Sequence, residues 1–381
     1  MTEQAKISWI SPLPPQPSGV ANYAREVLPL LRRHYEVESY EDAQITEEEA
    51  LKATAADLLL CHVGNNSKFH ESAYRLALRH PSLVVLHDLC CHHLVADLTL
   101  GRGRVREYVT HCEASDGEEG RRNAERNAAF GFQEELGFQI LCVKPVVDAS
   151  LGILVHSAWA EKTLRRICPQ AWIRRIPFVV IGKSWIDRTV GRNLPFPTIL
   201  LPGFVTRPKL PFHLLTAVRR LAGRGHYPRL VFGGGCSFQE ELERAADRLG
   251  IGERVLFTGS MSEEEYHEVL SQATVCACLR DPSAGESSAT LWQAMAHGKP
   301  CVVIDHAGYA ELPSGTVAKV SPGLSLIDQL EAVFDRLLDD PILRSSLGRE
   351  AKMFIQEEHP HEAVEEGYLQ AVKSFLAGGE E

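Results

Sequence analysis

The sequence predicts an α/β protein of two Rossmann-like domains, and three observations support this. A chain of 381 residues is too long for one ordinary core and suits two domains of fewer than about 200 residues each. Short apolar runs alternate with amphipathic stretches in both halves, as in βαβ units. Glycine, prolines and polar residues at 189–198 are typical of a linker. We therefore expect ligand sites at the carboxyl ends of the strands, facing an interdomain cleft.

Four apolar runs in the first half predict strands: KISWIS (6–11), ADLLLCHV (56–63), SLVVLHD (82–88) and LGILVHS (151–157). Between the first two, residues 18–33 show the apolar stripe of a helix, which Pro29 should kink or shorten. Residues 103–147 carry many charges at helical spacing, so we expect helices inserted between strands.

Five further runs predict strands in the second half: TILLPGF (198–204), RLVFGGG (229–235), RVLFTGS (254–260), TVCACL (274–279) and PCVVID (300–305). Near the end, Val364, Tyr368, Val372 and Phe375 form one apolar stripe. The helix 361–381 is expected to pack back on the first domain.

Composition narrows the class of function. Hydrophobic content of 44% and charged content of 24% are ordinary for a globular protein, and a net charge of −10 argues against general nucleic-acid binding. The ten cysteines are scattered without CxxC spacing, which favours reduced buried thiols. Because no apolar run reaches the ~20 residues of a membrane span and the start lacks signal-peptide features, we expect a cytoplasmic protein.

The stretch DPSAGESSATLWQAMAHGKPCVVID, residues 281–305, carries the strongest chemical signal. Ser287 or Ser288 can cap a helix that runs to about His297, where Gly298 suits a left-handed stop. The amino end of this helix presents unpaired N–H groups and partial positive charge, which suit a diphosphate. Any capped helix has this property, so a surface helix is the alternative.

In this stretch the chain resembles the family-four retaining glycosyltransferases of the GT-B fold. The family motif has a glutamate, seven residues, then a second glutamate before Ala-Met-Ala and a glycine. Here QAMAHGKP matches the end of the motif with Gln293 in the second position, and the first glutamate is displaced by one to Glu286. The resemblance implies that Glu286 binds a donor-sugar hydroxyl and Gln293 the ribose. The alternative for Glu286 is an ordinary acid before a helix.

Weaker matches follow in the first half. The loop ending at Gly19 resembles the family's first-strand loop, where a glycine lets the backbone approach donor phosphate or acceptor; a proline-rich turn is the alternative. His87 matches the family's histidine near the donor sugar, although a structural histidine is the alternative. The neighbouring acceptor-side residues are Asn65, Asn66 and Asp88.

In PGFVTRPKL the second half keeps the family's lysine as Lys209, which would stabilise the diphosphate, whereas Phe204 stands where the family has arginine. Arg207 could supply that charge. A solvated lysine before a helix is the alternative. VFGGG (231–235) lacks the dinucleotide fingerprint, and the resemblance places Gly259 and Ser260 near the nucleotide base.

No metal and no cofactor are expected. Asp88, His92 and His93 could suggest a metal site, but the sequence has no DxD triplet and no second ligand cluster. The resemblance likewise implies catalysis without an obligatory metal.

The resemblance therefore implies a retaining, hexosyl-type glycosyltransferase of polysaccharide biosynthesis. Residues 1–190 would form the acceptor domain and 191–360 the domain that binds the nucleotide-diphosphate sugar. The acceptor would be a glycan, a lipid-linked intermediate or a small molecule, and a lipid-linked one would bring the protein to the inner face of the membrane. Two alternatives are a non-catalytic nucleotide-sugar-binding subunit and a nucleotide-sugar epimerase on the same fold.

Overall fold

The computed structural model describes residues 4–133, 137–188 and 196–376. The chain divides into two compact units: unit 1 comprises 1–179, 284–287 and 361–381, and unit 2 comprises 180–283 and 288–360. The predicted domain boundary at 190 and 191 lies outside the described residues. Each unit has its own apolar core around one parallel sheet, which confirms the predicted α/β fold with Rossmann-like units.

The sheet of unit 1 has six parallel strands in the order β2-β1-β3-β4-β5-β6. Their bounds are β1 Lys6–Ser11, β2 Glu36–Glu41, β3 Leu58–Val63, β4 Leu83–Leu86, β5 Gly152–Val155 and β6 Ile173–Arg175. The four predicted runs are β1, β3, β4 and β5. The edge strands β2 and β6 were not predicted, because EVESYE alternates charged residues and β6 has only three residues.

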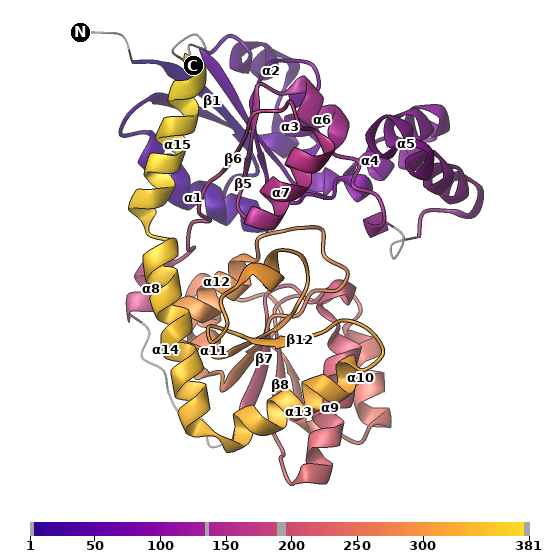
Figure 1. The fold of residues 1–381 in the computed structure, drawn as a ribbon, viewed down its shortest axis with the longest axis vertical. Coiled ribbons are helices and arrows are strands. Elements are labelled where there is room, and N and C mark those ends of the chain that lie inside the picture. Colours follow the sequence, from indigo (N-terminus) through magenta and orange to yellow (C-terminus); the bar gives the residue numbers. More distant parts are fainter. Residues whose placement is uncertain (1–3, 134–136, 189–195, 377–381) are drawn as a thin grey trace. The chain divides into compact units, whose positions relative to one another are not determined.

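Helices cover both faces of this sheet (Figure 1). They are α1 Gly19–Leu31, α2 Glu47–Ala53, α3 Ser67–Ala77, α4 His92–Leu98, α5 Val105–Phe130, α6 Lys144–Ala149, α7 Ala158–Ile167 and α15 His361–Leu376. Pro29 lies in the last turn of α1, which ends two residues before the predicted end. The hydroxyls of Tyr23 in α1 and Tyr368 in α15 lie 2.9 Å apart, so α15 packs on the first half of the chain.

The inserted helices are α5 and α6, as the charged stretch predicted. Helix α5 is interrupted at Gly117, whose φ of 63° and ψ of −144° are not helical. Its second part packs against the first. The two approach so closely that a Cβ at Gly120 would lie 2.1 Å from the carbonyl oxygen of Cys112. The result is a helical hairpin that projects from unit 1 (Figure 1).

The sheet of unit 2 also has six parallel strands, in the order β12-β11-β10-β7-β8-β9. Their bounds are β7 Thr198–Pro202, β8 Arg229–Gly233, β9 Val255–Phe257, β10 Val275–Ala277, β11 Cys301–Ile304 and β12 Ala318–Val320. Every run predicted in this half is a strand, and the short edge strand β12 was not predicted.

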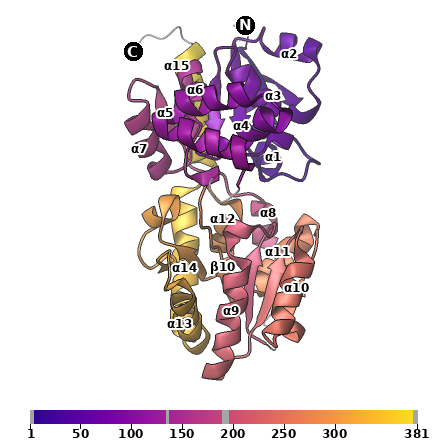
Figure 2. The ribbon, with the colours of Figure 1, turned by 90° about the vertical axis from the view of Figure 1, so that its right-hand side faces the viewer.

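Seven helices pack around this sheet among the described residues (Figure 2). They are α8 Lys183–Arg188, α9 Pro211–Leu221, α10 Gln239–Arg248, α11 Glu263–Gln272, α12 Ala289–Ala296, α13 Leu326–Asp339 and α14 Pro341–Glu358. Helix α9 packs beside α10 and α13, whereas α12 packs beside α14. Within the described ranges, no helix combines the length and apolar character needed to cross a bilayer.

Candidate functional site

Three adjacent strands of unit 1 each deliver a histidine at their carboxyl ends. His62 is the fifth residue of β3, His87 follows β4, and His156 follows β5. The Nδ1 of His62 lies 2.9 Å from the Nε2 of His87, and the rings of His87 and His156 are 5.5 Å apart. Tyr23 packs edge-on against His87 at 5.0 Å. The predicted residue His87 therefore belongs to a buried aromatic cluster.

Burial keeps this cluster neutral. Desolvation, reinforced by the neighbouring histidines, lowers the pKa of both His62 and His87 well below the ordinary value. Among the described residues the Nε2 of His62 is buried without a hydrogen-bond partner, so the imidazole proton is best placed on Nδ1, where it donates to Nε2 of His87. His87 then carries its own proton on Nδ1. It can act as a neutral donor and not as a cation.

The sequence pattern contained a signal for this cluster that our interpretation did not use. An apolar run ending in histidine occurs three times, as LLLCHV, LVVLHD and GILVHS. Since the three strands lie side by side, the repeated histidine places three imidazoles at one edge of the sheet. Our prediction selected only His87.

The residues predicted to lie on the acceptor side act as helix caps and connectors in unit 1. The Oδ1 of Asn65 accepts from the backbone N–H groups of His93 and Leu94 at 2.9 and 3.2 Å, and its backbone N–H donates to Asp88 at 2.7 Å. Asn66 caps α3. The structure brings Asn65 and Asp88 together beside His87, and these contacts hold the loop after β4 in place.

The loop 284–287, which precedes α12 in the chain, groups with unit 1. The carbonyl of Ala284 accepts from the N–H groups of Leu89 and Cys90, both at 2.8 Å. Gly285 has a φ of 75°, and a Cβ there would lie 2.5 Å from the ring of Trp159. Glu286 and Ser287 are thereby held beside the segment that follows His87. The sequence analysis connected Glu286 only with the motif around α12, and it did not predict that the loop 284–287 belongs to unit 1.

In unit 2, a lysine and the start of a helix converge on one glycine. Lys209 is only 8% exposed, and its Nζ donates to the carbonyl of Pro202 at the end of β7, at 2.6 Å. A Cβ on the next residue, Gly203, would lie 2.7 Å from the Cγ2 of Thr290 and 3.3 Å from the Nζ of Lys209. The ammonium and the first turn of α12 therefore flank the same short stretch of backbone.

Local sequence explains why α12 begins and ends where it does. The Ser288 hydroxyl accepts from the N–H of Leu291, and Gly298 adopts the left-handed conformation with a φ of 67°. The N–H groups of Ala289 and Thr290 precede the first intrahelical hydrogen bond and can bind an anion. Gln293 lies on the buried side of this helix, where its Nε2 donates to the carbonyl of Ile181 at 3.2 Å.

The guanidinium of Arg207 is directed to another partner. It contacts the Glu241 carboxylate at 3.0 and 3.2 Å and lies over the ring of Phe238, 4.8 Å from its centroid. Phe204 is 54% exposed and stands where the resemblance implies an arginine. The buried cation close to α12 is therefore Lys209.

Glycines line the ends of β8 and β9 in unit 2. A Cβ on Gly234 would lie 2.5 Å from the backbone of Gly203, and one on Gly235 would lie 3.5 Å from Phe204 and 3.8 Å from the Ser260 hydroxyl. Gly259 has a φ of 67°. Gly235 therefore lies close to both Phe204 and Ser260, the residue predicted to contact the base.

Gly19 is the first residue of α1, and Ser18 caps the helix by accepting from the Val20 N–H at 3.2 Å. Beyond the neighbouring backbone, a Cβ at Gly19 would meet no atom of the described residues within 4 Å. The fold of the chain itself therefore does not require a glycine here.

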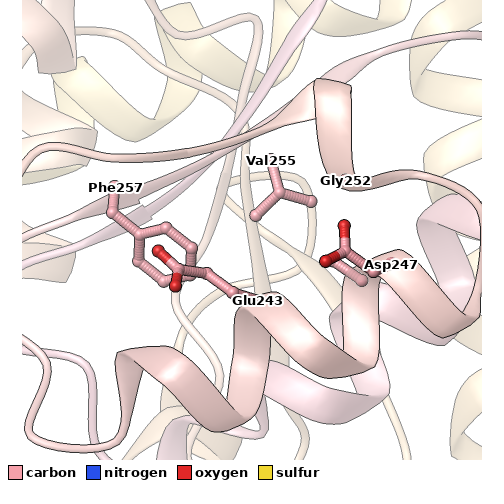
Figure 3. Close-up of a pocket in the computed structure, with 6 residues that line it drawn as sticks. Glu243, Asp247, Gly252, Val255 and Phe257 are labelled. Atoms are coloured by element: carbon pink, nitrogen blue, oxygen red, sulfur yellow. The ribbon is translucent and has the colours of Figure 1, made fainter.

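A recess of about 280 Å³ lies elsewhere in unit 2, between α10 and the edge strand β9. Glu243 and Asp247 of α10 line it together with Val255 and Phe257 (Figure 3). Two carboxylates at this position would repel a diphosphate. The recess contains none of the predicted site residues.

Comparisons with known proteins agree with this architecture. Residues 186–354 match the family model described as Glycosyl transferases group 1. An alpha-D-kanosaminyltransferase from Streptomyces kanamyceticus is 29% identical over 157 residues, which are 41% of this chain and only 40% of that enzyme.

Solved structures resemble the whole chain. The sucrose-phosphate synthase from Thermosynechococcus elongatus has a TM-score of 0.68 at 18% identity, with 98% of this chain and 100% of that one covered. Anabaena Alr3699/HepE, solved with UDP and glucose, has a TM-score of 0.63 at 14% identity, with 97% and 100% covered. The fold and the matched domain define the class of structure: the chain has the two-unit α/β fold of GT-B glycosyltransferases, and its residues 186–354 match the group 1 domain.

Proposed function

We propose that this protein transfers a sugar from a nucleoside diphosphate sugar to an acceptor, with retention of anomeric configuration and without an obligatory metal. The observation that supports it most is the convergence of Lys209 and the start of α12 on Gly203. In glycosyl transfer the negative charge grows on the departing diphosphate, and preorganised donors aimed at that charge lower the barrier.

The two kinds of donor have complementary roles. The N–H groups at the start of α12 add a partial positive charge, while the Lys209 ammonium adds a full one. An ammonium has three donor hydrogens, so the bond to Pro202 that holds Lys209 in position is compatible with a hydrogen bond to a phosphate oxygen. Gly203, without a side chain, lets the diphosphate approach the backbone between them.

On the sugar side, we propose that Glu286 binds a sugar hydroxyl and that the neutral His87 donates a hydrogen bond from its Nδ1 to the sugar. Only Ser287 separates Glu286 from the cap residue Ser288, so the carboxylate lies close to the start of α12 along the chain. We propose a front-side reaction in which the departing phosphate assists the acceptor. The resemblance to family-four retaining enzymes supports this route. We also propose that this chain belongs to that family.

For the nucleotide, we assign the base to the Gly259 and Ser260 loop and the ribose to Gln293. Because Phe204 lies against Gly235 near Ser260, its exposed ring can stack on the nucleotide where the resemblance implied an arginine. Arg207 remains a proposed donor ligand only if the nucleotide displaces Glu241. The UDP in the HepE structure makes UDP-sugars the first donors to test.

The proposed acceptor is a glycan, a lipid-linked intermediate or a small molecule. Because one relative is named a kanosaminyltransferase, we would test an amino-sugar donor as well as hexose donors. A lipid-linked acceptor would entail peripheral association at the inner face of the membrane, and polysaccharide biosynthesis would be the setting.

The test begins with a thermal-shift screen of UDP-, GDP- and dTDP-sugars against the purified chain, since a ligand that binds only the folded protein raises its unfolding temperature. Donors that bind are then incubated with acceptors, and the released nucleoside diphosphate and the anomeric configuration of the product are measured. Failure of every donor to bind would refute the proposal, and an inverted product would refute the retaining mechanism.

One observation favours a non-catalytic nucleotide-sugar-binding subunit as the second candidate. Arg207 is engaged by Glu241 and Phe204 replaces the family arginine, so fewer charges face the donor than the resemblance implies. Such a subunit would bind a donor in the thermal-shift screen yet release no nucleotide with any acceptor or with water. Conversion of the donor sugar without transfer would identify an epimerase.

A further inference from the structure

Three potential metal ligands meet in the interior of unit 1, and none of them is among the residues assigned above to the donor or the acceptor. His92 is the first residue of α4, Cys112 lies in α5, and Cys142 precedes α6. Their ligand atoms all lie within 4.8 Å of one another, and each of the three residues is fully buried. We propose that this cluster binds one thiophilic divalent cation, with zinc as the best match, and that the ion fastens the α5 hairpin to unit 1.

The separation of the two sulfur atoms fits a shared metal ion. The Sγ atoms of Cys112 and Cys142 are 3.5 Å apart. Two thiolates on a tetrahedral zinc with Zn–S bonds of about 2.3 Å are about 3.8 Å apart, whereas a disulfide requires about 2.05 Å. A displacement of a few tenths of an ångström would complete the metal geometry, while a disulfide needs a far larger movement.

Hydrogen bonds orient the His92 ring as in a metal-bound histidine. Its Nδ1 lies 3.1 Å from the carbonyl of Gly137, which only accepts, so Nδ1 carries the proton. Nε2 then keeps its lone pair and accepts from the hydroxyl of Tyr108 at 2.6 Å. Asn127 donates to the same hydroxyl at 2.9 Å, which leaves the phenolic hydrogen for Nε2. A backbone carbonyl that fixes the tautomer is typical of metal-ligating histidines.

The backbone at Cys142 is held in a conformation that presents its sulfur to Cys112. Cys142 has a φ of 52°, in the left-handed region that is unfavourable for a residue with a side chain. Asp116, one turn after Cys112 in α5, accepts from the N–H groups of Leu141 and Cys142, both at 3.0 Å. The hairpin thus maintains the strained residue that completes the cluster.

Tyr108 supplies a fourth potential ligand atom, its hydroxyl oxygen, next to the cluster. It lies one turn before Cys112 on the same face of α5, and its hydroxyl lies 2.6 Å from the Nε2 of His92. The tetrahedral set is then two sulfurs, one imidazole and this hydroxyl. A closed set of this kind describes a structural site rather than a catalytic one.

A second group of potential ligands among the described residues, His226 with Asp335 and Asp339, offers a contrast. It is partly exposed, and Asp335 already pairs with Arg224 at 3.2 Å. Oxygen-rich exposed groups of this kind do not select zinc. No spacing in the sequence signals the buried cluster, because its residues lie 20 and 30 positions apart in the chain.

The test uses the full chain purified under reducing conditions without chelator. We expect about one zinc per chain by elemental analysis, and a higher unfolding temperature after chelator-treated protein receives ZnCl₂ but not MgCl₂. Cobalt(II) added to the metal-free protein should give the near-ultraviolet absorption of thiolate-to-cobalt charge transfer. Cys112→Ser and Cys142→Ser should each weaken zinc binding at least 10-fold, whereas the buried Cys168→Ser control should bind as the unmodified protein does.

The measurements on the unmodified protein stand even if a variant fails to fold. Absence of zinc, of a zinc-dependent shift and of the cobalt absorption would overturn the proposal. A protein two hydrogens lighter, with Cys112 and Cys142 joined as a disulfide after purification in reductant, would overturn it as well. Glycosyl transfer is not part of either readout, so its failure leaves this result unaffected.

Discussion

Replacing Lys209 by methionine removes one ammonium from unit 2 and keeps most of the side-chain volume. The variant loses the hydrogen bond to the buried carbonyl of Pro202. Leaving that carbonyl without this donor should lower the free energy of unfolding by about 1–3 kcal/mol. The catalytic cost is larger if the ammonium stabilises the departing diphosphate. Loss of one such donor costs about 3–4 kcal/mol in the transition state, a fall of roughly 10²–10³ in turnover.

Lys299 provides a matched control in the same unit. Its Nζ also donates to a backbone carbonyl, that of Ser271, and it is partly buried after α12. Lys299→Met should therefore lower the unfolding temperature comparably, by about 2–4 °C for each kcal/mol, and leave turnover within a few-fold of the unmodified protein. Turnover is measured as release of nucleoside diphosphate at saturating donor and acceptor.

The comparison of the two variants decides the argument. If Lys209→Met keeps turnover within a few-fold while its unfolding temperature falls as that of Lys299→Met does, Lys209 is a structural lysine. The assignment of the diphosphate to its vicinity would then be wrong.

Three further predictions concern unit 1. Glu286→Gln should reduce transfer at least 10-fold while the affinity for free nucleoside diphosphate, measured by calorimetry, stays nearly the same; an equal loss of both would remove Glu286 from the sugar. Gly19→Ala should fold normally, because beyond the neighbouring backbone no atom of the described residues lies within 4 Å of the added carbon, yet it should raise the KM for donor or acceptor; unchanged kinetics would show that no ligand approaches there. Burial lowers the pKa of His70 to about 4, whereas a histidine in the unfolded chain binds its proton near pH 6.5. The free energy of unfolding should therefore fall as the pH drops from about 6.5 towards 4, and His70 should account for about 3 kcal/mol of this fall. Burial also raises the pKa of Asp42 to about 7, which opposes this change, but the other buried histidines act with His70. Near-ultraviolet circular dichroism during urea unfolding at several pH values should show the loss, and constant stability down to pH 5 would contradict it.

Much of the fold could be predicted because its signals are local. Buried parallel strands are short apolar runs, and each of the nine predicted runs contains a strand. The limits of α12 followed from a capping serine and a glycine stop, and both have those roles. The missed strands β2, β6 and β12 lie at sheet edges, where less of the strand is buried and the apolar pattern is weaker.

The predicted site residues are distributed in a way that no local pattern specified. Arg207 and Lys209 are two positions apart, yet one pairs with Glu241 and the other lies buried beside Pro202. Which cation is buried depends on what α10 and β7 place opposite each side chain. Spacing in the chain contains no information about those partners.

By itself the sequence determined the α/β class, the alternation of strands and helices, the caps of α12 and the position of the histidine after β4. These features depend on hydrophobic periodicity and on contacts between residues a few positions apart, so a short segment of the sequence is enough to predict each of them. Only the tertiary structure decided that His62 bonds to His87, that the Glu286 loop belongs to unit 1, and that His92 and two distant cysteines meet in one buried cluster. Those arrangements depend on which strands become neighbours in a sheet and on how α5 folds back, and such long-range packing leaves no regular spacing in the sequence.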